Sequence, residues 1–280
     1  MIKTPEVSVI IPAFNTGYLI KETVRSAINQ SIENIEIIIV DDASTDDTPE
    51  LIRQLEDQDS RVRSIRLERN SNLPAVPRNV GLKAAKAKYV ALLDHDDLWQ
   101  TQKLERQLQV MKKYPNTGLI HSALLPLTGK VTLKSFLDLP NISNQRIDYE
   151  SLRKYNQIIC SSVLLRTDVA LAAGGFDERP ELRAVEDFHL WLRISKEHDV
   201  RYISEIHGVY RVNPFSTSAR ENMEVKLDYL RKLGMIDPLR NQRSPVWSKR
   251  LKILQLFSGL YFHTIDATLR KKLHKTPRIH

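Results

Sequence analysis

Three carboxylates stand together at Asp94, Asp96 and Asp97, directly after the apolar run of residues 89–93. Carboxylates this close repel one another, so a fold that keeps them supplies a positive partner, usually a divalent cation. A hard cation held by one or two carboxylates fills its other positions with water and with the phosphates of a substrate. The cluster therefore predicts a phosphorylated substrate such as a nucleotide diphosphate. The alternative from these residues alone is an acidic turn that caps the next helix.

Two acidic pairs, Asp41-Asp42 and Glu186-Asp187, are further candidates for chemistry. The first pair and the dipeptide Phe14-Asn15 each follow an apolar run. Each acidic pair also has a purely structural interpretation, because carboxylates at the start of a helix interact favourably with its dipole. The distinction depends on whether the fold brings these distant residues together.

The elements that would position these residues alternate between strand and helix through the first 120 residues. Short β-branched apolar runs predict buried strands, and apolar residues spaced by three and four predict helices. We expect Pro12 to end the first strand and Pro49 to occupy the first turn of a helix. The expected strands are residues 7–11, 35–40, 62–67 and 89–93, and the expected helices are residues 18–30, 49–58, 77–86 and 98–114.

This alternation predicts an α/β fold with a mostly parallel central sheet flanked by helices and joined by right-handed crossovers. Ligands of such open sheets bind outside the carboxyl ends of the strands. The polar residues that follow the expected strands should therefore converge on one crevice. Beyond residue 118 the pattern weakens, and we expect a strand at 158–165, a short helix at 168–173, a mostly helical stretch at 182–198 and a short strand at 209–212.

Composition limits the class of protein. The chain has 280 residues, 41% hydrophobic and 27% charged, as is ordinary for a soluble globular protein. The single cysteine, Cys160, excludes an internal disulfide and fits a reducing compartment. No signal-peptide pattern opens the chain, and no apolar run approaches the roughly 20 residues that span a bilayer. We therefore expect a cytoplasmic protein.

The net charge of +8 is concentrated at the end of the chain. Residues 240–280 hold ten Lys or Arg and one acidic residue, whereas residues 1–239 sum to −1. A near-neutral body argues against nucleic-acid binding. Apolar residues between Trp247 and Ile265 share a helical face, with basic residues before and after it. This helix could lie on the inner face of a membrane, or it could pack on the body with its charges in water.

Six motifs together resemble the family 2 glycosyltransferases, a large inverting family with the GT-A fold. Each motif is weak alone, but six in this order and at this spacing are specific. The resemblance covers residues 7–120 and about 158–213. It implies a catalytic domain at 1–220, with a nucleotide-sugar half at 1–120 and an acceptor half at 121–220, before a basic helical extension at 221–280. The motifs are residues 7–15, 41–46, 78–82, 94–97, 174–177 and 186–187.

On the donor side, the resemblance implies contacts with a nucleotide-diphosphate sugar. Asp42 would accept the N3–H of uracil or thymine. Asp94 would face the ribose, while Asp96, helped by Asp97, would hold the Mg²⁺ or Mn²⁺ that offsets charge on the leaving diphosphate. The implied nucleotide and donor residues are Pro12, Phe14, Asn15, Asp41, Asp42, Arg78, Asp94, His95 and Asp96.

On the acceptor side, the resemblance implies that Asp187 is the general base. It would take a proton from the acceptor hydroxyl as that oxygen attacks the anomeric carbon opposite the phosphate, which inverts the configuration in one step. The expected acceptor is a glycan or a lipid-linked glycan of a surface polysaccharide. The other implied acceptor-side residues are Gly175, Phe176, Glu186, Trp191 and Arg211.

Two segments depart from the family pattern. Asn213 stands where the family often has a His after a Tyr-Arg dipeptide, which leaves a third metal ligand open. Residues 72–75 replace a loop that is often richer in glycine, so details of the donor pocket are not carried over.

Three functions therefore compete. The favoured one is an inverting, metal-dependent glycosyltransferase that uses a UDP-sugar or, as second choice, a dTDP-sugar. A catalytically silent nucleotide-binding module of the same fold would have less reason to keep Asp94, Asp96 and Asp187. A phospho-receiver signalling domain also places acidic residues after strands, but it is too short to account for residues 158–213. The sequence leaves the oligomeric state open.

Overall fold

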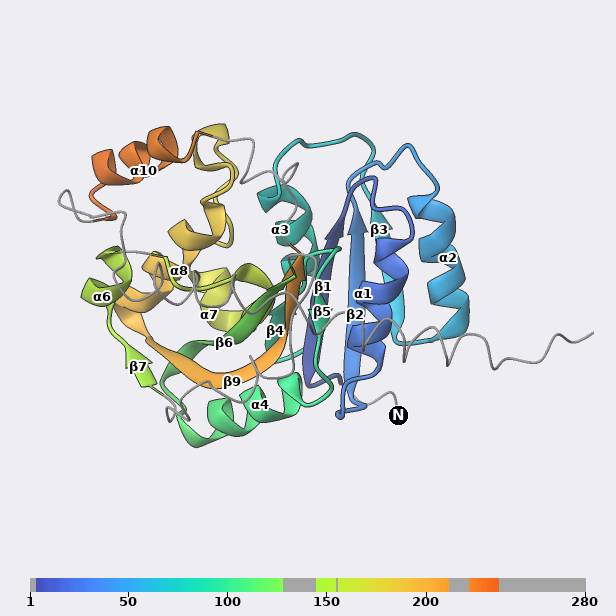
Figure 1. Cartoon of the computed structure of the whole chain (residues 1–280), viewed down its shortest axis with the longest axis horizontal. Helices are drawn as coiled ribbons and strands as arrows, with labels where there is room; N and C mark the ends of the chain where they lie inside the picture. The colour runs from blue at the N-terminus through green and yellow to red at the C-terminus, as the bar shows by residue number, and fades with distance from the viewer. Residues whose placement is uncertain (1–3, 128–144, 155, 212–221, 237–280) are drawn as a thin grey trace, which may run out of the picture.

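The computed structural model describes residues 4–127, 145–154, 156–211 and 222–236. Within them, helices flank one nine-stranded sheet (Figure 1). The strand order is β3-β2-β1-β4-β8-β6-β9-β5, and β7 also pairs with β9. These strands are β1 (Val7–Ala13), β2 (Ile35–Asp41), β3 (Val62–Arg66), β4 (Tyr89–Leu92), β5 (Leu98–Trp99), β6 (Thr117–Leu127), β7 (Gln145–Ile147), β8 (Leu164–Arg166) and β9 (Asp199–Arg211).

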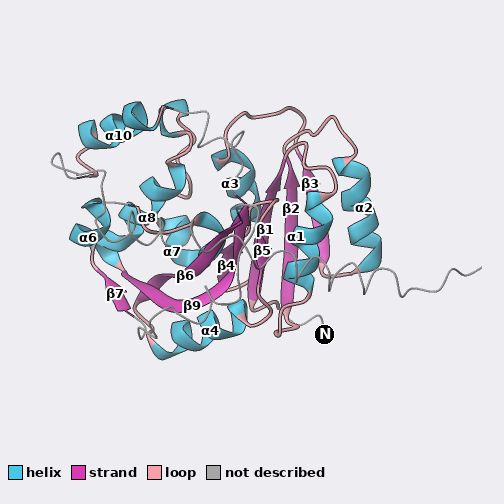
Figure 2. Ribbon diagram, in the orientation of Figure 1, coloured by secondary structure: helices cyan, strands magenta, loops and turns pink. Residues whose placement is uncertain are grey.

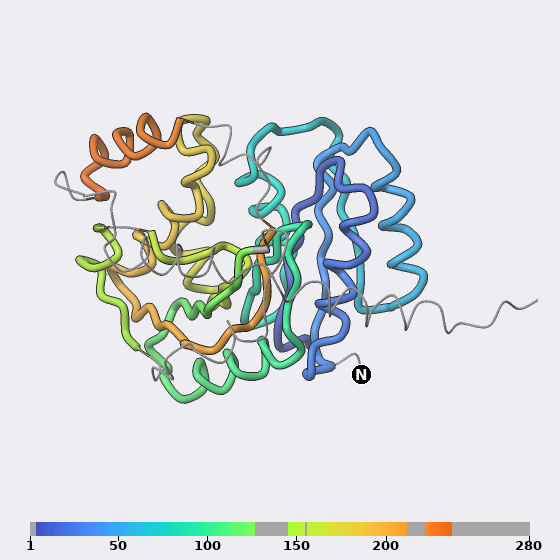
Figure 3. The backbone as a smooth tube through the Cα atoms, in the orientation of Figure 1, coloured from blue at the N-terminus to red at the C-terminus, as the bar shows by residue number. Residues whose placement is uncertain are grey.

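The direction of the strands confirms an α/β fold with a mostly parallel sheet. Strands β3, β2, β1 and β4 pair in parallel, as do β6 and β9. Strand β8 joins these two groups by antiparallel pairing with both β4 and β6. Six of the nine strands therefore run one way, and β5, β7 and β8 run the other. The backbone trace in Figure 3 shows late strand β9 beside earlier β6.

Alternate residues of the strands build two hydrophobic cores, one on each face of the sheet. Ile10 and Leu92 face one core, whereas Ile11 and Leu93 face the other, as expected from the two-residue period of a strand. The first core is covered by α3 (Ala75–Ala84), α6 (Tyr149–Lys154), α7 (Thr167–Ala172), α8 (Glu186–Glu197) and α10 (Met223–Lys232). The second is covered by α1 (Leu19–Ile28), α2 (Thr48–Gln58) and α4 (Lys103–Lys113) (Figure 2).

The predicted elements of the first 93 residues are confirmed, with one correction at Pro12. That proline lies inside β1 instead of ending it. Leu93 N donates to Ile10 O on the β4 side, and Asp42 N donates to Ala13 O on the β2 side. The alternation places the ring nitrogen of Pro12 on the β4 side, beyond the paired residues of β4. A residue without an N–H is tolerated there because no ladder bond is lost.

The later half of the chain differs more from the predictions. Residues 98–99 form β5 instead of starting a helix, and the predicted strand at 158–165 is the 3-10 turn η1 (Cys160–Ser162) followed by β8. The short strand expected at 209–212 is the end of the 13-residue β9. A second 3-10 turn, η2 (Pro180–Leu182), precedes α8. The sequence missed β6 and β7, because pairing with β9, and not a marked alternation, defines them.

Two predictions fall outside the described residues: Asn213 and most of the basic extension at 221–280, of which residues 222–236 are described. Helix α10 opens that extension and packs on η2. Among the described helices, none is both long and apolar enough to cross a bilayer.

Candidate active site

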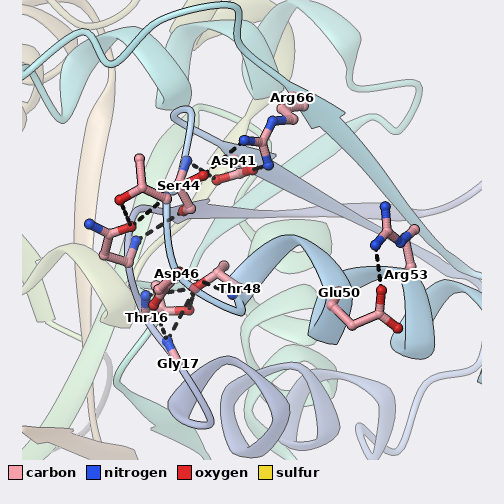
Figure 4. Close-up of polar contacts among 11 residues, drawn as sticks. Thr16, Gly17, Asp41, Ser44, Asp46, Thr48, Glu50, Arg53 and Arg66 are labelled. Atoms are coloured by element: carbon pink, nitrogen blue, oxygen red, sulfur yellow. Dashed lines mark hydrogen bonds and ion pairs between the residues drawn. The ribbon is translucent and has the colours of Figure 1, made fainter.

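The loops that follow β1 and β2 are joined to each other by hydrogen bonds (Figure 4). Thr48 Oγ1 accepts from Thr16 N at 2.9 Å and from Gly17 N at 3.1 Å. Asp46 Oδ2 also accepts from Gly17 N, at 3.2 Å. A polar side chain at the start of α2 thus fixes the loop that starts α1. The carboxyl ends of β1 and β2 are held together as one rigid edge.

Asn15 extends this junction from the β1 side. Its backbone lies in the left-handed region, with φ +48°, which asparagine tolerates better than most residues. Asn15 N donates to Ser44 Oγ at 2.9 Å, and its side-chain Oδ1 accepts from Thr45 N at 2.8 Å. The Asn15 amide therefore braces the loop after β2. Phe14 beside it is 41% exposed and leaves an aromatic surface open at this edge.

Asp41 and Asp42 are both buried, but they have different partners. Asp41 Oδ2 accepts from Arg66 Nη1 at 2.7 Å, and its Oδ1 accepts from Ser44 N at 3.0 Å. Both oxygens are therefore used inside the protein, so Asp41 supports the turn. Both oxygens of Asp42 also accept hydrogen bonds, from Ser71 N at 2.9 Å and from Ser71 Oγ at 2.8 Å.

The carboxylates at the end of β4 lie in three different environments. Asp94 N donates to Ser161 Oγ at 3.0 Å, and Ser161 Oγ donates to Asp97 Oδ2 at 2.5 Å. Asp97 Oδ1 accepts from Arg211 N at 2.9 Å. Burial, with Asp94 and Asp96 nearby, raises the pKa of Asp97 well above its usual range. Ser161 is therefore hydrogen-bonded to both Asp94 and Asp97, the first and last residues of the acidic cluster.

Asp96 is the member of this cluster that the protein leaves available. Its side chain is partly exposed, and no other residue that the structure describes donates a hydrogen bond to its carboxylate; its own backbone N–H does. Burial, together with the charge of Asp94, raises its pKa, although His95 and Arg211 oppose the rise. A cation bound nearby would stabilise the negative charge of such a carboxylate. The Arg211 guanidinium does not bind this carboxylate directly. Its Nε donates to the backbone oxygen of Asp96 at 2.7 Å, and its Nη2 donates to Glu22 Oε2 at 2.6 Å.

Arg78 joins two of the motifs found in the sequence, those of Asp94 and Glu186. Its Nη2 donates to Asp94 Oδ1 at 2.8 Å, and its Nη1 donates to Glu186 Oε1 at 2.6 Å. The guanidinium also lies over the ring of Phe176, 5.7 Å from the centroid. Burial opposes its charge, but Asp94 and Glu186 raise the pKa of Arg78 well above its usual value. Arg78 comes from α3, and its partners come from the ends of β4 and the start of α8.

Asp187 follows Glu186 in the first turn of α8. Burial and the adjacent Glu186 carboxylate raise the pKa of Asp187 to about 7, against the opposing charge of Arg78. The raised value suits a group that must take a proton near neutral pH. Glu186 itself is 4% exposed, and its Oε2 is buried without a hydrogen-bond partner in the described residues.

The Gly174-Gly175-Phe176 turn is fixed by Asn79, the residue after Arg78. Asn79 Nδ2 donates to Phe176 O at 2.7 Å, and Phe176 N donates to Asn79 Oδ1 at 2.8 Å. Gly175 has φ +66°, and a Cβ there would lie 2.6 Å from Asn79 Oδ1. Glycine is therefore required by both the backbone angle and the close approach. The turn belongs to the wall beside Arg78.

Trp191 corrects one of the predicted acceptor contacts. Its side chain has no exposed surface and packs edge-on against Phe176, with 6.1 Å between the ring centroids. It lies on α8 one turn beyond Asp187, on the same face of the helix, but its side chain is fully buried in the core. Trp191 therefore supports Phe176 from inside the core and has no surface that an acceptor could contact.

The donor set fits a hard divalent cation that also binds substrate oxygens. Among the described residues, no three His, Cys, Asp or Glu side chains form a complete metal cage. Magnesium usually relies on one or two carboxylates, with water and phosphate oxygens as the other ligands. Asp96, whose carboxylate accepts from no other residue in the described part of the chain, meets this requirement better than Asp97, whose oxygens both accept bonds from Ser161 and Arg211.

Three residues of this site had no signal in the sequence: Ser71, Ser161 and Glu22. Ser71 stands in a polar turn, Ser161 follows Cys160, and Glu22 lies on a helix surface. Their importance comes from the partners they reach, Asp42, Asp97 and Arg211, which are 29, 64 and 189 residues away. The polar cluster Asn70-Ser71-Asn72 indicates a turn at Ser71 but does not indicate that this serine contacts Asp42.

The chain is similar to a family model and to named proteins. Residues 8–162 match the family model described as glycosyl transferase family 2. WfaP of Escherichia coli, named as a UDP-Glc:alpha-D-GlcNAc-diphosphoundecaprenol beta-1,3-glucosyltransferase, is 36% identical over 222 residues, covering 78% of this chain and 82% of that protein. TuaG of Bacillus subtilis (strain 168), whose name places it in teichuronic acid biosynthesis, is 34% identical over 218 residues, covering 78% and 83%.

Solved structures share the fold. TarS 1-349 of S. aureus in complex with UDP-GlcNAc superposes with a TM-score of 0.65 at 19% identity, covering 77% of this chain and 61% of that one. The mannosyltransferase PcManGT of Pyrobaculum calidifontis, in complex with GDP-Man and Mn²⁺, gives 0.60 at 19% identity, covering 77% and 59%. The chain thus spans about three fifths of each of these structures. The predicted GT-A fold is confirmed.

Proposed function

Because the chain belongs to glycosyl transferase family 2 and is a glycosyltransferase, we propose that it transfers a sugar from a UDP-sugar to an acceptor hydroxyl with inversion. A dTDP-sugar is the second candidate donor. The family match removes the phospho-receiver alternative.

The observation that carries the proposal is the double ion pair of Arg78. One side chain contacts Asp94 of the predicted donor half and Glu186 of the predicted acceptor half, at 2.8 and 2.6 Å. Asp187 stands next to Glu186, so the proposed base is held close to the proposed diphosphate site. A fixed distance between base and donor is the main requirement of a single in-line displacement.

The donor would lie along the edge formed by β1, β2 and β4. Phe14 offers an exposed ring to the base, and Asp42 offers a carboxylate to its N3–H. Asp94 would accept from the ribose hydroxyls. WfaP is named for UDP-Glc, and the related TarS structure contains UDP-GlcNAc, which favours uracil as the base.

Asp187 would act as the general base in the acceptor half. With a pKa of about 7, a large share of its carboxylates is ionised at neutral pH while each remains basic enough to accept a proton. The proton would move from the acceptor hydroxyl to the carboxylate as the oxygen attacks the anomeric carbon. The nucleoside diphosphate leaves with the electron pair of the broken bond. No covalent intermediate is required.

Asp96 would hold a Mg²⁺ or Mn²⁺ ion, with Asp97 as a neighbouring carboxylate. When bound, the ion would offset negative charge on the diphosphate leaving group. The residues of this chain contribute by keeping Asp96 fixed: Arg211 Nε binds its backbone oxygen, and Ser161 positions both Asp94 and Asp97.

We further propose that the acceptor is a growing surface glycan, carried on a lipid at the cytoplasmic face of the membrane. The support is the name of WfaP, which specifies a diphosphoundecaprenol-linked acceptor, and the name of TuaG, which specifies teichuronic acid. The basic tail of residues 240–280 has the charge that an anionic membrane surface attracts.

A calorimetric titration tests the donor assignment. UDP, dTDP, GDP and CDP would each be titrated with Mn²⁺ and with EDTA into the wild type, Asp96→Ala and the exposed control Asp57→Ala. We expect metal-dependent binding of UDP in the wild type and the control and its loss in Asp96→Ala. Binding of no nucleotide by the wild type would overturn the site. NMR of the product formed from a UDP-sugar then reports whether the anomeric configuration inverts.

A further inference from the structure

The loop after β3 supplies the only recorded side-chain partner of Asp42 in the described residues. Ser71 N donates to Asp42 Oδ1 at 2.9 Å, and Ser71 Oγ donates to Asp42 Oδ2 at 2.8 Å. One residue therefore binds both oxygens of a carboxylate that is 5% exposed. Such a two-point contact fixes the plane of the carboxylate as well as its position.

Ser71 also lines a cavity. This cavity has a volume of about 620 Å³ and is formed by Leu67, Glu68, Arg69, Asn70, Ser71 and Val76. Ser71 thus both lines the cavity and donates hydrogen bonds to Asp42. The hydroxyl is further placed by its own turn, because Leu73 N donates to Ser71 Oγ at 3.2 Å and Asn72 has φ +57°. The turn aims Ser71 back at β2.

We propose that Ser71 is a specificity-determining residue: by binding both oxygens of Asp42, it presents a fixed, acceptor-only carboxylate that selects nucleotides whose base carries a ring N–H. This inference rests on the proposed function, because it assumes that Asp42 meets the base. It adds Ser71 to the donor site and names the property of the base that is read.

The selection follows from hydrogen-bond chemistry. The Asp42 carboxylate accepts from two donors of Ser71, and an ionised carboxylate only accepts hydrogen bonds. Each oxygen keeps a lone pair that Ser71 does not use. The N3–H of uracil or thymine donates to such an oxygen, whereas N3 of cytosine is itself an acceptor and is repelled. Leaving a buried acceptor facing another acceptor costs more than losing an ordinary hydrogen bond.

Removing the Ser71 hydroxyl should change selectivity more than stability. In Ser71→Ala the backbone N–H still binds Oδ1, but Oδ2 loses its donor and the carboxylate can turn away from an opposing cytosine. We expect UDP affinity to fall roughly tenfold, the equivalent of one charge-assisted hydrogen bond. CDP affinity should stay the same or rise. The ratio of the two affinities should therefore fall about tenfold.

The experiment measures dissociation constants of UDP and CDP, with Mn²⁺, by calorimetry on the wild type and four variants, among them Ser71→Ala. Ser64→Ala, in the same strand-and-loop unit, is the matched control and should keep the wild-type ratio. Ser71→Thr keeps the hydroxyl and should restore most of the preference for UDP. Asp42→Asn adds an amide N–H that can donate to cytosine N3, so it should favour CDP even if Ser71→Ala folds poorly.

The outcomes separate this inference from the proposed function. If the wild type binds neither nucleotide, the proposed function fails. If the wild type prefers UDP and Ser71→Ala keeps that ratio, only the role of Ser71 is overturned. An equal loss of UDP and CDP in Ser71→Ala also overturns it, because that result describes a structural residue without a part in selection.

Discussion

Arg78 Nη1 lies 2.6 Å from Glu186 Oε1, although 108 residues separate them in the chain. The side chains are 8% and 5% exposed, so this ion pair is shielded from water. The same guanidinium binds Asp94 at 2.8 Å. One guanidinium thus pairs with two carboxylates. The motifs that contain Asp94 and Glu186 lie far apart in the sequence, and this side chain holds them together.

Replacing Arg78 should strongly destabilise the protein. Arg78→Ala leaves Glu186 and Asp94 without their cation, and breaking a buried ion pair from one side costs about 3–5 kcal/mol. The free energy of unfolding from denaturant titration measures the loss. Arg53→Ala is the matched control, because the Arg53–Glu50 pair on α2 is exposed (Figure 4) and should contribute little. Equal effects of the two substitutions would contradict the buried role of Arg78.

The activity should depend on pH through Asp187. As the base it must be ionised, and its pKa is about 7, so kcat/KM should rise with pH up to about 7 and then level off. Glu186→Gln removes the neighbouring negative charge that helps to raise this pKa. The acidic limb of the profile should therefore move to lower pH. An unchanged limb in Glu186→Gln would show that another group controls the profile.

The same shift predicts an effect on stability. The pKa of Asp187 is higher in the folded chain, about 7 against an ordinary 3.8, so its protonated form favours folding and that contribution is lost as pH rises through 7. Asp187→Asn is uncharged throughout. We expect it to be more stable than the wild type above pH 7, by on the order of 1–3 kcal/mol, with a smaller difference near pH 4. Thermal unfolding at both pH values checks this.

A divalent cation should stabilise the protein only together with nucleotide. Binding to the folded state at about 100 times the dissociation constant adds about 2.7 kcal/mol, which for a chain of this size is a rise in Tm of about 5–10 °C. UDP with Mn²⁺ should produce this rise in the wild type and in Asp57→Asn. For Asp96→Asn, we expect the same Tm with UDP and Mn²⁺ whether or not EDTA is present. If EDTA still lowered the Tm of this variant, the ion would bind elsewhere.

Ala43 carries a backbone angle that suits glycine. It has φ +60° in the turn between Asp42 and Ser44, where a Cβ is strained. Ala43→Gly should therefore stabilise the protein by about 0.5–1 kcal/mol. Ala172→Gly, at an exposed helical position of α7, should instead destabilise it. Denaturant titration of both variants compares them, and a loss in Ala43→Gly would contradict the strain.

The first 93 residues could be predicted because their signals are local. Strands such as β1 and β2 are continuous β-branched runs buried on both faces, and polar residues mark each strand end. The position of Asp41, Asp42 and Asp94 at one edge followed from the parallel topology alone. The local pattern could not show which partner each carboxylate has, and Asp41 proved to be paired with Arg66.

The second half could not be predicted in the same way, because long-range pairing defines it. Strand β9 has mixed polar and apolar residues, and its 13 residues are held by β5, β6 and β7. Trp191 illustrates the same limit in the site. A tryptophan near an acidic pair is more often a core residue than a sugar platform, and the packing against Phe176 shows that Trp191 belongs to the core.

The order of strands has a consequence for how the chain folds during synthesis. The set β3-β2-β1-β4 can form once 92 residues have emerged, but β8, at residues 164–166, must arrive before the edge of β4 is covered. Strand β5 waits longer, because its partner lies at residues 208–209. Pairings of such long range are slow to form and leave strand edges open to aggregation in the meantime. The strands beside Asp42 and Asp94 can therefore pair on the ribosome before Glu186 is available to contact Arg78, and a nascent chain would acquire the proposed nucleotide-binding edge before it acquires its proposed base.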